Sequence, residues 1–172
     1  MTPDLQRLQQ NLVRLFRIVD YLELELVDDP QWPAPSDTSY LNERHRADPD
    51  IMANVEAMAA TNQRIAWFGH DQEGFLGLWR GEGEGALERA PVVRLDTEGQ
   101  YEIIAATIGD FLAVSMSRGE FNSAREELIE VGFTVAASHG DIWKALEGAE
   151  SPNDYRHVLY NQGRVRRGLD PI

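Results

Sequence analysis

The fold is decided by a stretch near the middle of the chain, Arg64–Arg80, which reads RIAWFGHDQEGFLGLWR. It holds two short apolar runs, 64–69 and 75–80, separated by the turn-forming residues 70–74. Short apolar runs with aromatic residues, bounded by Asp and Gly, are typical of strands joined by a tight connection. The stretch therefore predicts an antiparallel hairpin.

Two further strands follow this hairpin along the chain. Residues 91–95 read PVVRL, residues 101–106 read YEIIAA, and DTEG at 96–99 separates them. Because Asp and Gly in this spacing favour a turn, the two runs predict a second hairpin. Four consecutive strands with short connections predict a largely antiparallel meander.

One long helix is predicted at the N-terminus. Thr2 can cap it, and Pro3 suits the first helical position. Apolar residues then follow at spacings of three and four: Leu5, Leu8, Leu12, Leu15, Val19, Leu22 and Leu26. This heptad pattern fits a coiled-coil homodimer or a helix lying along its own core, and so few heptads favour the second.

The remaining segments complete an α+β class. Residues 28–49 are rich in Pro and Asp and predict a loop, after which Asp48-Pro49 begins a helix that ends near Asn62. From Ile108 onward helical spacing returns, so the last third of the chain is predicted to be helical. We expect one domain, 1–172, with a mostly antiparallel twisted sheet of about four to six strands flanked by helices.

Composition restricts the class of protein. The chain has 172 residues, is 42% hydrophobic and contains no Cys, so it can build a core but has no disulfide or thiol chemistry. No apolar run reaches the roughly 18 residues of a membrane span, and no basic flank leads into an apolar stretch at the start. We expect a cytoplasmic protein with no membrane contact.

The charge is the strongest global feature. The formal net charge is −13, distributed as −15 over residues 1–150 and +2 over residues 151–172. A body this acidic repels phosphate backbones, which disfavours direct nucleic-acid binding, and attracts basic partners. The alternative is that acidity serves solubility only. Arg164, Arg166 and Arg167 are expected to fasten the C-terminal tail to the acidic body.

Catalytic and cofactor motifs are largely missing. Gly81–Ala86 matches a G-x-G-x-x-A pattern, but Pro91 follows too soon for a crossover helix, and two glutamates would repel a pyrophosphate. The four histidines lack the spacing of a metal site. We therefore expect no enzyme, cofactor or metal. An enzyme using carboxylates such as Glu126 and Glu130 with an unidentified cofactor stays open as an alternative.

A binding face is the remaining candidate site. Acidic residues occupy the turns and loops around the sheet and are expected to form one acidic rim: Glu73, Glu82, Glu84, Glu88, Asp96 and Glu98. Trp67 and Trp79 lie on adjacent strands, where at least one is expected in the core, and Trp79 is a candidate anchor for a partner. Such a rim would steer a basic protein toward the sheet.

The middle of the chain resembles the SUKH superfamily, the bacterial relatives of the yeast Smi/Knr-type cell-wall regulators. The resemblance rests on the two runs and turn of 65–79, on APVVRL at 90–95, on DTEG at 96–99 and on Phe111-Leu112, and covers residues 60–115, about a third of the chain. It implies an α+β domain with a twisted sheet flanked by helices and no catalytic residues. Bacterial members are mostly immunity proteins that bind and neutralise a cognate toxin, often a nuclease or deaminase.

These observations predict a non-enzymatic binding protein that neutralises a basic toxin through its acidic sheet face. The alternative is a general regulatory scaffold that binds several cellular proteins. A homodimer through the N-terminal helix is a further possibility that the heptad pattern permits.

Overall fold

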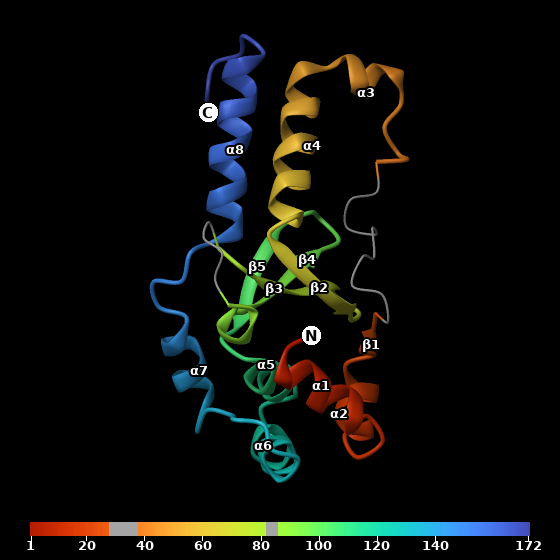
Figure 1. Ribbon diagram of the computed structural model, residues 1–172, viewed down its shortest axis with the longest axis vertical. Helices are drawn as coiled ribbons and strands as arrows, with labels where there is room; N and C mark the ends of the chain where they lie inside the picture. The colour runs from red at the N-terminus through yellow and green to blue at the C-terminus, as the bar shows by residue number, and fades with distance from the viewer. Residues whose placement is uncertain (28–37, 82–85) are drawn as a thin grey trace.

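A computed structural model of the protein describes residues 1–27, 38–81 and 86–172. Within these residues one open antiparallel sheet has the order β1-β2-β3-β4-β5 (Figure 1). Its strands are β1 (Glu25–Leu26), β2 (Ile65–His70), β3 (Gly74–Trp79), β4 (Val92–Asp96) and β5 (Tyr101–Ala105). The helices are α1 (Pro3–Gln10), α2 (Phe16–Tyr21), α3 (Glu43–Ala47), α4 (Pro49–Asn62), the 3-10 helix η2 (Leu87–Arg89), α5 (Ile108–Val114), α6 (Phe121–Glu130), α7 (His139–Ala145) and α8 (Pro152–Arg166). The α+β class is confirmed.

Both predicted hairpins are present. In β2–β3, Ile65 pairs with Trp79 and His70 with Phe75, and a bulge between Trp67 and Gly69 shifts the register. In β4–β5, Leu95 pairs with Tyr101. Because Gly74 pairs with Asp96, the β2–β3 and β4–β5 turns lie at the same end of the sheet.

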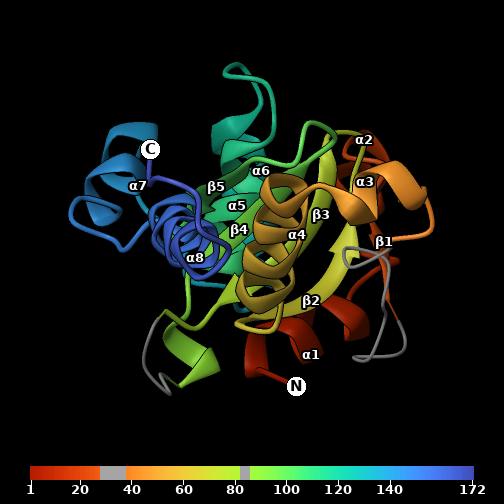
Figure 2. The ribbon, with the colours of Figure 1, turned by 90° about the horizontal axis from the view of Figure 1, so that it is seen from above.

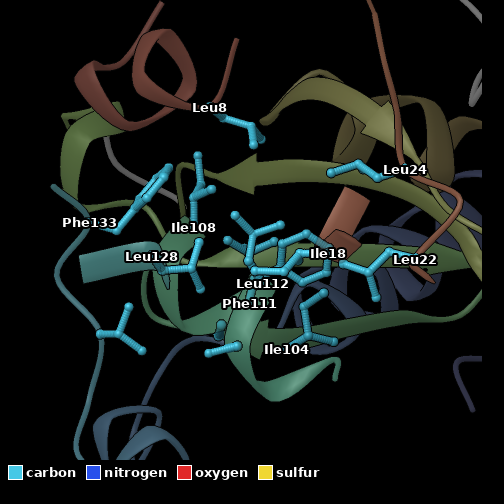
Figure 3. Packing of buried hydrophobic residues seen from close by; sticks show 14 of the residues in the cluster. Leu8, Ile18, Leu22, Leu24, Ile104, Ile108, Phe111, Leu112, Leu128 and Phe133 are labelled. Carbon is cyan, nitrogen blue, oxygen red and sulfur yellow. The ribbon is translucent and has the colours of Figure 1, made fainter. Parts of the chain in front are cut away.

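Helices cover both faces of the sheet. The α4 and α8 helices pack side by side over one face, whereas α1, α2, α5 and α6 lie under the other (Figures 1 and 2). The larger core lies on the second face, where α2 and α5 bring Ile18, Leu22, Phe111 and Leu112 together above Ile104 of β5 (Figure 3). The smaller core, under α4 and α8, contains Ile65, Trp79, Val93, Leu95 and Tyr101.

The prediction of a single long N-terminal helix is wrong, because two separate helices, α1 and α2, form there. The helix ends at Asn11, whose side chain donates to the Arg7 carbonyl over 2.8 Å, and such local side-chain bonding competes with helix continuation. A second helix, α2, then ends before Glu23, which has a φ of 47°, and the chain continues into β1. The heptad spacing correctly marked Leu8 and Leu15, which are buried in the protein's own core.

The strand β1 was not predicted, and it joins the sheet beside β2 with Leu26 opposite Gly69. A Cβ atom on Gly69 would lie 2.5 Å from the carbonyl oxygen of Glu25. The absence of a side chain there lets the two backbones approach. The prediction of a loop over residues 28–49 is also partly wrong, because α3 forms within this range. Residues 28–37 of the range lie outside the described residues.

The α4 and α8 helices are joined by close packing and by ion pairs. Asp48 caps α4 as predicted, its side chain accepting from the backbone N–H groups of Asp50 and Ile51. Arg164 pairs with Asp50, and Arg167 pairs with Glu56. These contacts confirm that the basic tail fastens to the acidic body.

No helix of the described residues combines the length and the apolar character that a membrane crossing requires.

Candidate functional site

A cavity of about 570 Å³ opens at the turn end of the sheet. It lies between β4 and β5 on one side and the ends of α2 and α5 together with α7 on the other. Leu22, Ile104 and Val114 contribute apolar side chains to its lining. A cavity of this size, partly apolar and partly polar, is of the kind that holds ligands or partner side chains.

A buried ion pair forms one wall of the cavity. The Arg94 Nη2 donates to Asp71 Oδ2 over 2.6 Å, and Arg94 Nη1 pairs with Glu73. The side chain of Asp71 is only 4% exposed, and its other oxygen accepts from the backbone N–H groups of Glu73 and Gly74. Asp71 therefore holds the β2–β3 turn against β4.

Glu102 supplies a third carboxylate to the cavity. It lies on β5 directly opposite Arg94, in the register of the β4–β5 pair. Its side chain is exposed and makes no hydrogen bond or ion pair within the part of the chain that the structure describes. With Asp71 and Glu73 already bound to Arg94, Glu102 is the carboxylate that is available to another molecule.

Two aromatic side chains complete the lining. Tyr21, at the last position of α2, and Trp143, in the middle of α7, are each 49% exposed. The neighbouring Ile142 is fully buried and anchors α7 to the larger core, and the Ser138 Oγ caps the helix by accepting from Asp141 N–H. The position of Trp143 at the cavity is thus set by core packing and by a helix cap.

The segment before α7 is also held in place by a buried carboxylate. Asp110 of α5 is 6% exposed and accepts from the backbone N–H of Ala136 over 2.8 Å. Its other oxygen accepts from the Thr107 hydroxyl. This network fixes how the chain enters α7, and hence where α7 meets the sheet.

The predicted acidic rim is not one surface. Glu73, Asp96 and Glu98 lie at the turn end of the sheet, whereas Glu88 lies in the β3–β4 connection at the opposite end. Glu82 and Glu84 lie outside the described residues, between Gly81 and Ala86 of that same connection. A meander places successive connections at alternate ends of its strands, so acidic residues in consecutive connections separate.

Two of the predicted partner-binding residues have structural roles. Trp79 is 2% exposed and packs edge-on against Tyr155 of α8, with ring centroids 5.5 Å apart. The prediction that it anchors a partner is therefore corrected: it belongs to the smaller core. Asp96 accepts from the N–H groups of Glu98 and Gln100 and so shapes the β4–β5 turn.

Most of the residues that line the cavity were not among the site residues predicted from the sequence. The opposition of Arg94 and Glu102 follows from the register of the β4–β5 hairpin, so the turn at 96–99 carried a usable signal for it. No local pattern indicates that Tyr21 and Trp143, which are far apart in the chain, meet at the same cavity. Glu126 and Glu130, the carboxylates of the enzyme alternative, are exposed on α6 and do not line this cavity.

Among residues 1–27, 38–81 and 86–172, no three His, Asp or Glu side chains come together in the way that a metal ion requires.

The chain matches no protein-family model, and neither the curated proteins nor the solved structures contain a significant match to it. The resemblance of residues 60–115 to the SUKH superfamily stays a prediction.

Proposed function

We propose that this protein is a non-enzymatic binding protein that recognises a basic toxin with the turn end of its sheet and neutralises it. The observation that carries the proposal is the charge of the cavity. Among its described lining residues, Asp71, Glu73 and Glu102 are acidic and Arg94 is the basic one. A surface of one sign raises the association rate of an oppositely charged partner and excludes partners of like charge.

The bonding of these carboxylates supports docking over acid–base catalysis. Asp71 and Glu73 are both paired with Arg94, and Asp71 accepts two backbone N–H groups in addition. General acid and base groups need oxygen atoms within reach of a substrate proton and contrasting environments. A pair that shares one guanidinium is better suited to shaping and charging a surface.

The net charge and the resemblance together support a toxin as the partner. Bacterial members of the SUKH superfamily are mostly immunity proteins, and residues 60–115 resemble that superfamily. A toxin that acts on nucleic acid carries a basic cleft, because its substrate is polyanionic. A chain of net charge −13 is complementary to such a cleft and can cover it.

The test begins with the genes next to the one that encodes this chain. Any toxin encoded there is expressed with and without this protein, and the purified pair is studied by calorimetry and stopped-flow kinetics. We expect rescued growth, a stable complex, and an association rate that falls steeply as salt is raised.

Matched charge reversals localise the binding surface. The double variant Glu73→Lys and Glu102→Lys is expected to slow association by about tenfold or more at low salt. The control, Glu126→Lys and Glu130→Lys on α6, makes the same change in net charge away from the cavity and is expected to have a much smaller effect. The proposal fails if the neighbouring genes encode no toxin, or if the toxin stays active in the presence of this protein. Many weak cellular partners would favour the scaffold alternative instead.

A further inference from the structure

The cavity itself indicates which chemical group of the partner it takes. We infer that it receives an arginine side chain of the partner protein, an inference that rests on the proposed function for the identity of the molecule carrying that arginine. Three features of the cavity support an arginine: its size and lining, the carboxylate that is left available, and the two aromatic side chains among its lining residues.

The size and lining of the cavity suit a long amphipathic side chain. At about 570 Å³ the cavity is far larger than a hydration site and lies within the usual range for ligand sites. Leu22, Ile104 and Val114 provide apolar contacts for a methylene stem, whereas the carboxylates lie on the β2–β3 turn and β5. Arginine pairs an apolar stem with a charged end in the same way.

The charges select a cation over an anion. Arg94 is 13% exposed, and its two terminal nitrogens are engaged by Asp71 and Glu73, so its charge is compensated within the protein. Glu102, opposite Arg94, has no such compensation within the described residues. An incoming anion would meet three carboxylates, whereas an incoming cation gains an ion pair with Glu102.

The aromatic rings favour a guanidinium over an ammonium group. Tyr21 and Trp143 are half-exposed and line the cavity from two different helices. A planar guanidinium stacks on aromatic faces and can bond a carboxylate with two parallel N–H groups. The ammonium group of lysine is strongly hydrated and lacks that planar geometry, so it gains less from the same lining.

The test uses N-acetyl-arginine amide as the probe and the full chain as the protein. Binding is followed by nuclear magnetic resonance through the indole N–H signal of Trp143, assigned with Trp143→Phe, and the buried Trp79 indole serves as the internal reference. At low salt we expect a saturable shift of the Trp143 signal with a Kd on the order of 10 mM, a weak affinity because one side chain supplies it all. N-acetyl-lysine amide is expected to bind several-fold more weakly, and the neutral N-acetyl-citrulline amide is expected not to bind.

Three variants separate a built site from general attraction to an acidic protein. Glu102→Gln and Trp143→Ala are each expected to weaken probe binding by about fivefold. Glu130→Gln removes the same charge from α6 and is expected to leave the Kd unchanged. Circular dichroism and thermal unfolding confirm that each variant is folded.

The outcomes distinguish this inference from the proposed function. The inference is overturned if the probe causes no saturable shift, if citrulline amide binds as well as arginine amide, or if inorganic phosphate shifts Trp143 in its place. It is also overturned if Glu102→Gln and Trp143→Ala leave toxin binding intact, a result under which the proposed function still stands. Saturable arginine binding without any toxin complex would instead support the cavity and contradict the proposed function.

Discussion

Arg94 on β4 donates to Asp71 of the β2–β3 turn at an Nη2–Oδ2 distance of 2.6 Å. A side chain of β4 therefore fixes the turn that joins the two preceding strands. The Arg94 Nε is buried and lacks an acceptor within the described residues. The stability of this arrangement therefore depends on the two terminal nitrogens and on the carboxylates that they bind.

Asp71→Ala is expected to lower the free energy of unfolding by about 3 kcal/mol, because it removes a buried partner of Arg94 and the acceptor of two backbone N–H groups. Glu73→Ala removes the exposed partner of the same guanidinium, so it is expected to cost less than about 1 kcal/mol. Urea unfolding of the two variants measures the difference. Equal losses would show that Asp71 has no special role in the turn.

Leu15→Ala tests where the N-terminal heptad residues pack. Leu15 is 1% exposed in the protein's own core, so the variant is expected to lose about 2–4 kcal/mol of unfolding free energy. Val13→Ala, at a position 91% exposed in the same segment, is expected to change it by less than about 0.5 kcal/mol. Urea unfolding at two protein concentrations is the measurement. A midpoint for the unaltered chain that rises with concentration would place Leu15 in a dimer interface instead.

The hairpins and helix caps were predictable because each is determined within a few residues. The turn at 96–99, the Asp48 cap of α4 and the Ser151 cap of α8 depend on side chains that bond their own neighbouring backbone. The heptad spacing likewise included the buried Leu8, Leu15 and Leu22, although the buried Ile18 lies outside it. It did not report the break after Gln10, because a hydrophobic period reflects burial and not continuous backbone hydrogen bonding.

The cavity was not predictable because its walls come from distant parts of the chain. Tyr21, Arg94 and Trp143 meet there through the packing of α2 and α7 against the sheet, which no local pattern encodes. The error on Trp79 has a similar origin. Period-two alternation separates the two faces of a strand, but α8, which covers the face that bears Trp79, comes much later in the chain.

Gly163→Val is expected to destabilise the contact between α4 and α8. A Cβ atom at Gly163 would lie 3.2 Å from the Cβ of Ala53, so a branched side chain there forces the two helices apart. We expect a loss of about 2 kcal/mol or more in thermal or urea unfolding. Gln162→Val introduces the same β-branched residue at the adjacent exposed position of α8 and is the control. If the control loses as much, helix propensity and not the close contact accounts for the effect.

Tyr101 is expected to make stability depend on pH in alkaline solution. Its hydroxyl donates to Asn62 Oδ1 over 2.6 Å, and burial raises the pKa of Tyr101 well above its ordinary value of 10.0, against a smaller opposing effect of Arg156. The unfolded chain therefore releases this proton at a lower pH than the folded one. The stabilisation is present in full below pH 10 and is lost as the pH rises above it, by about 1.4 kcal/mol at pH 11.

Tyr101→Phe isolates this contribution. The variant is expected to be less stable at pH 8, because the buried hydrogen bond to Asn62 is gone, by about 1 kcal/mol. Between pH 9 and pH 11, however, its free energy of unfolding is expected to fall less than that of the unaltered protein, since the other titrating groups are common to both. Urea unfolding across this range, together with tyrosinate absorbance of the folded state, gives both quantities. Parallel pH profiles for the two proteins would mean that Tyr101 ionises in the folded state as readily as in the unfolded one, and that its burial does not hold the proton.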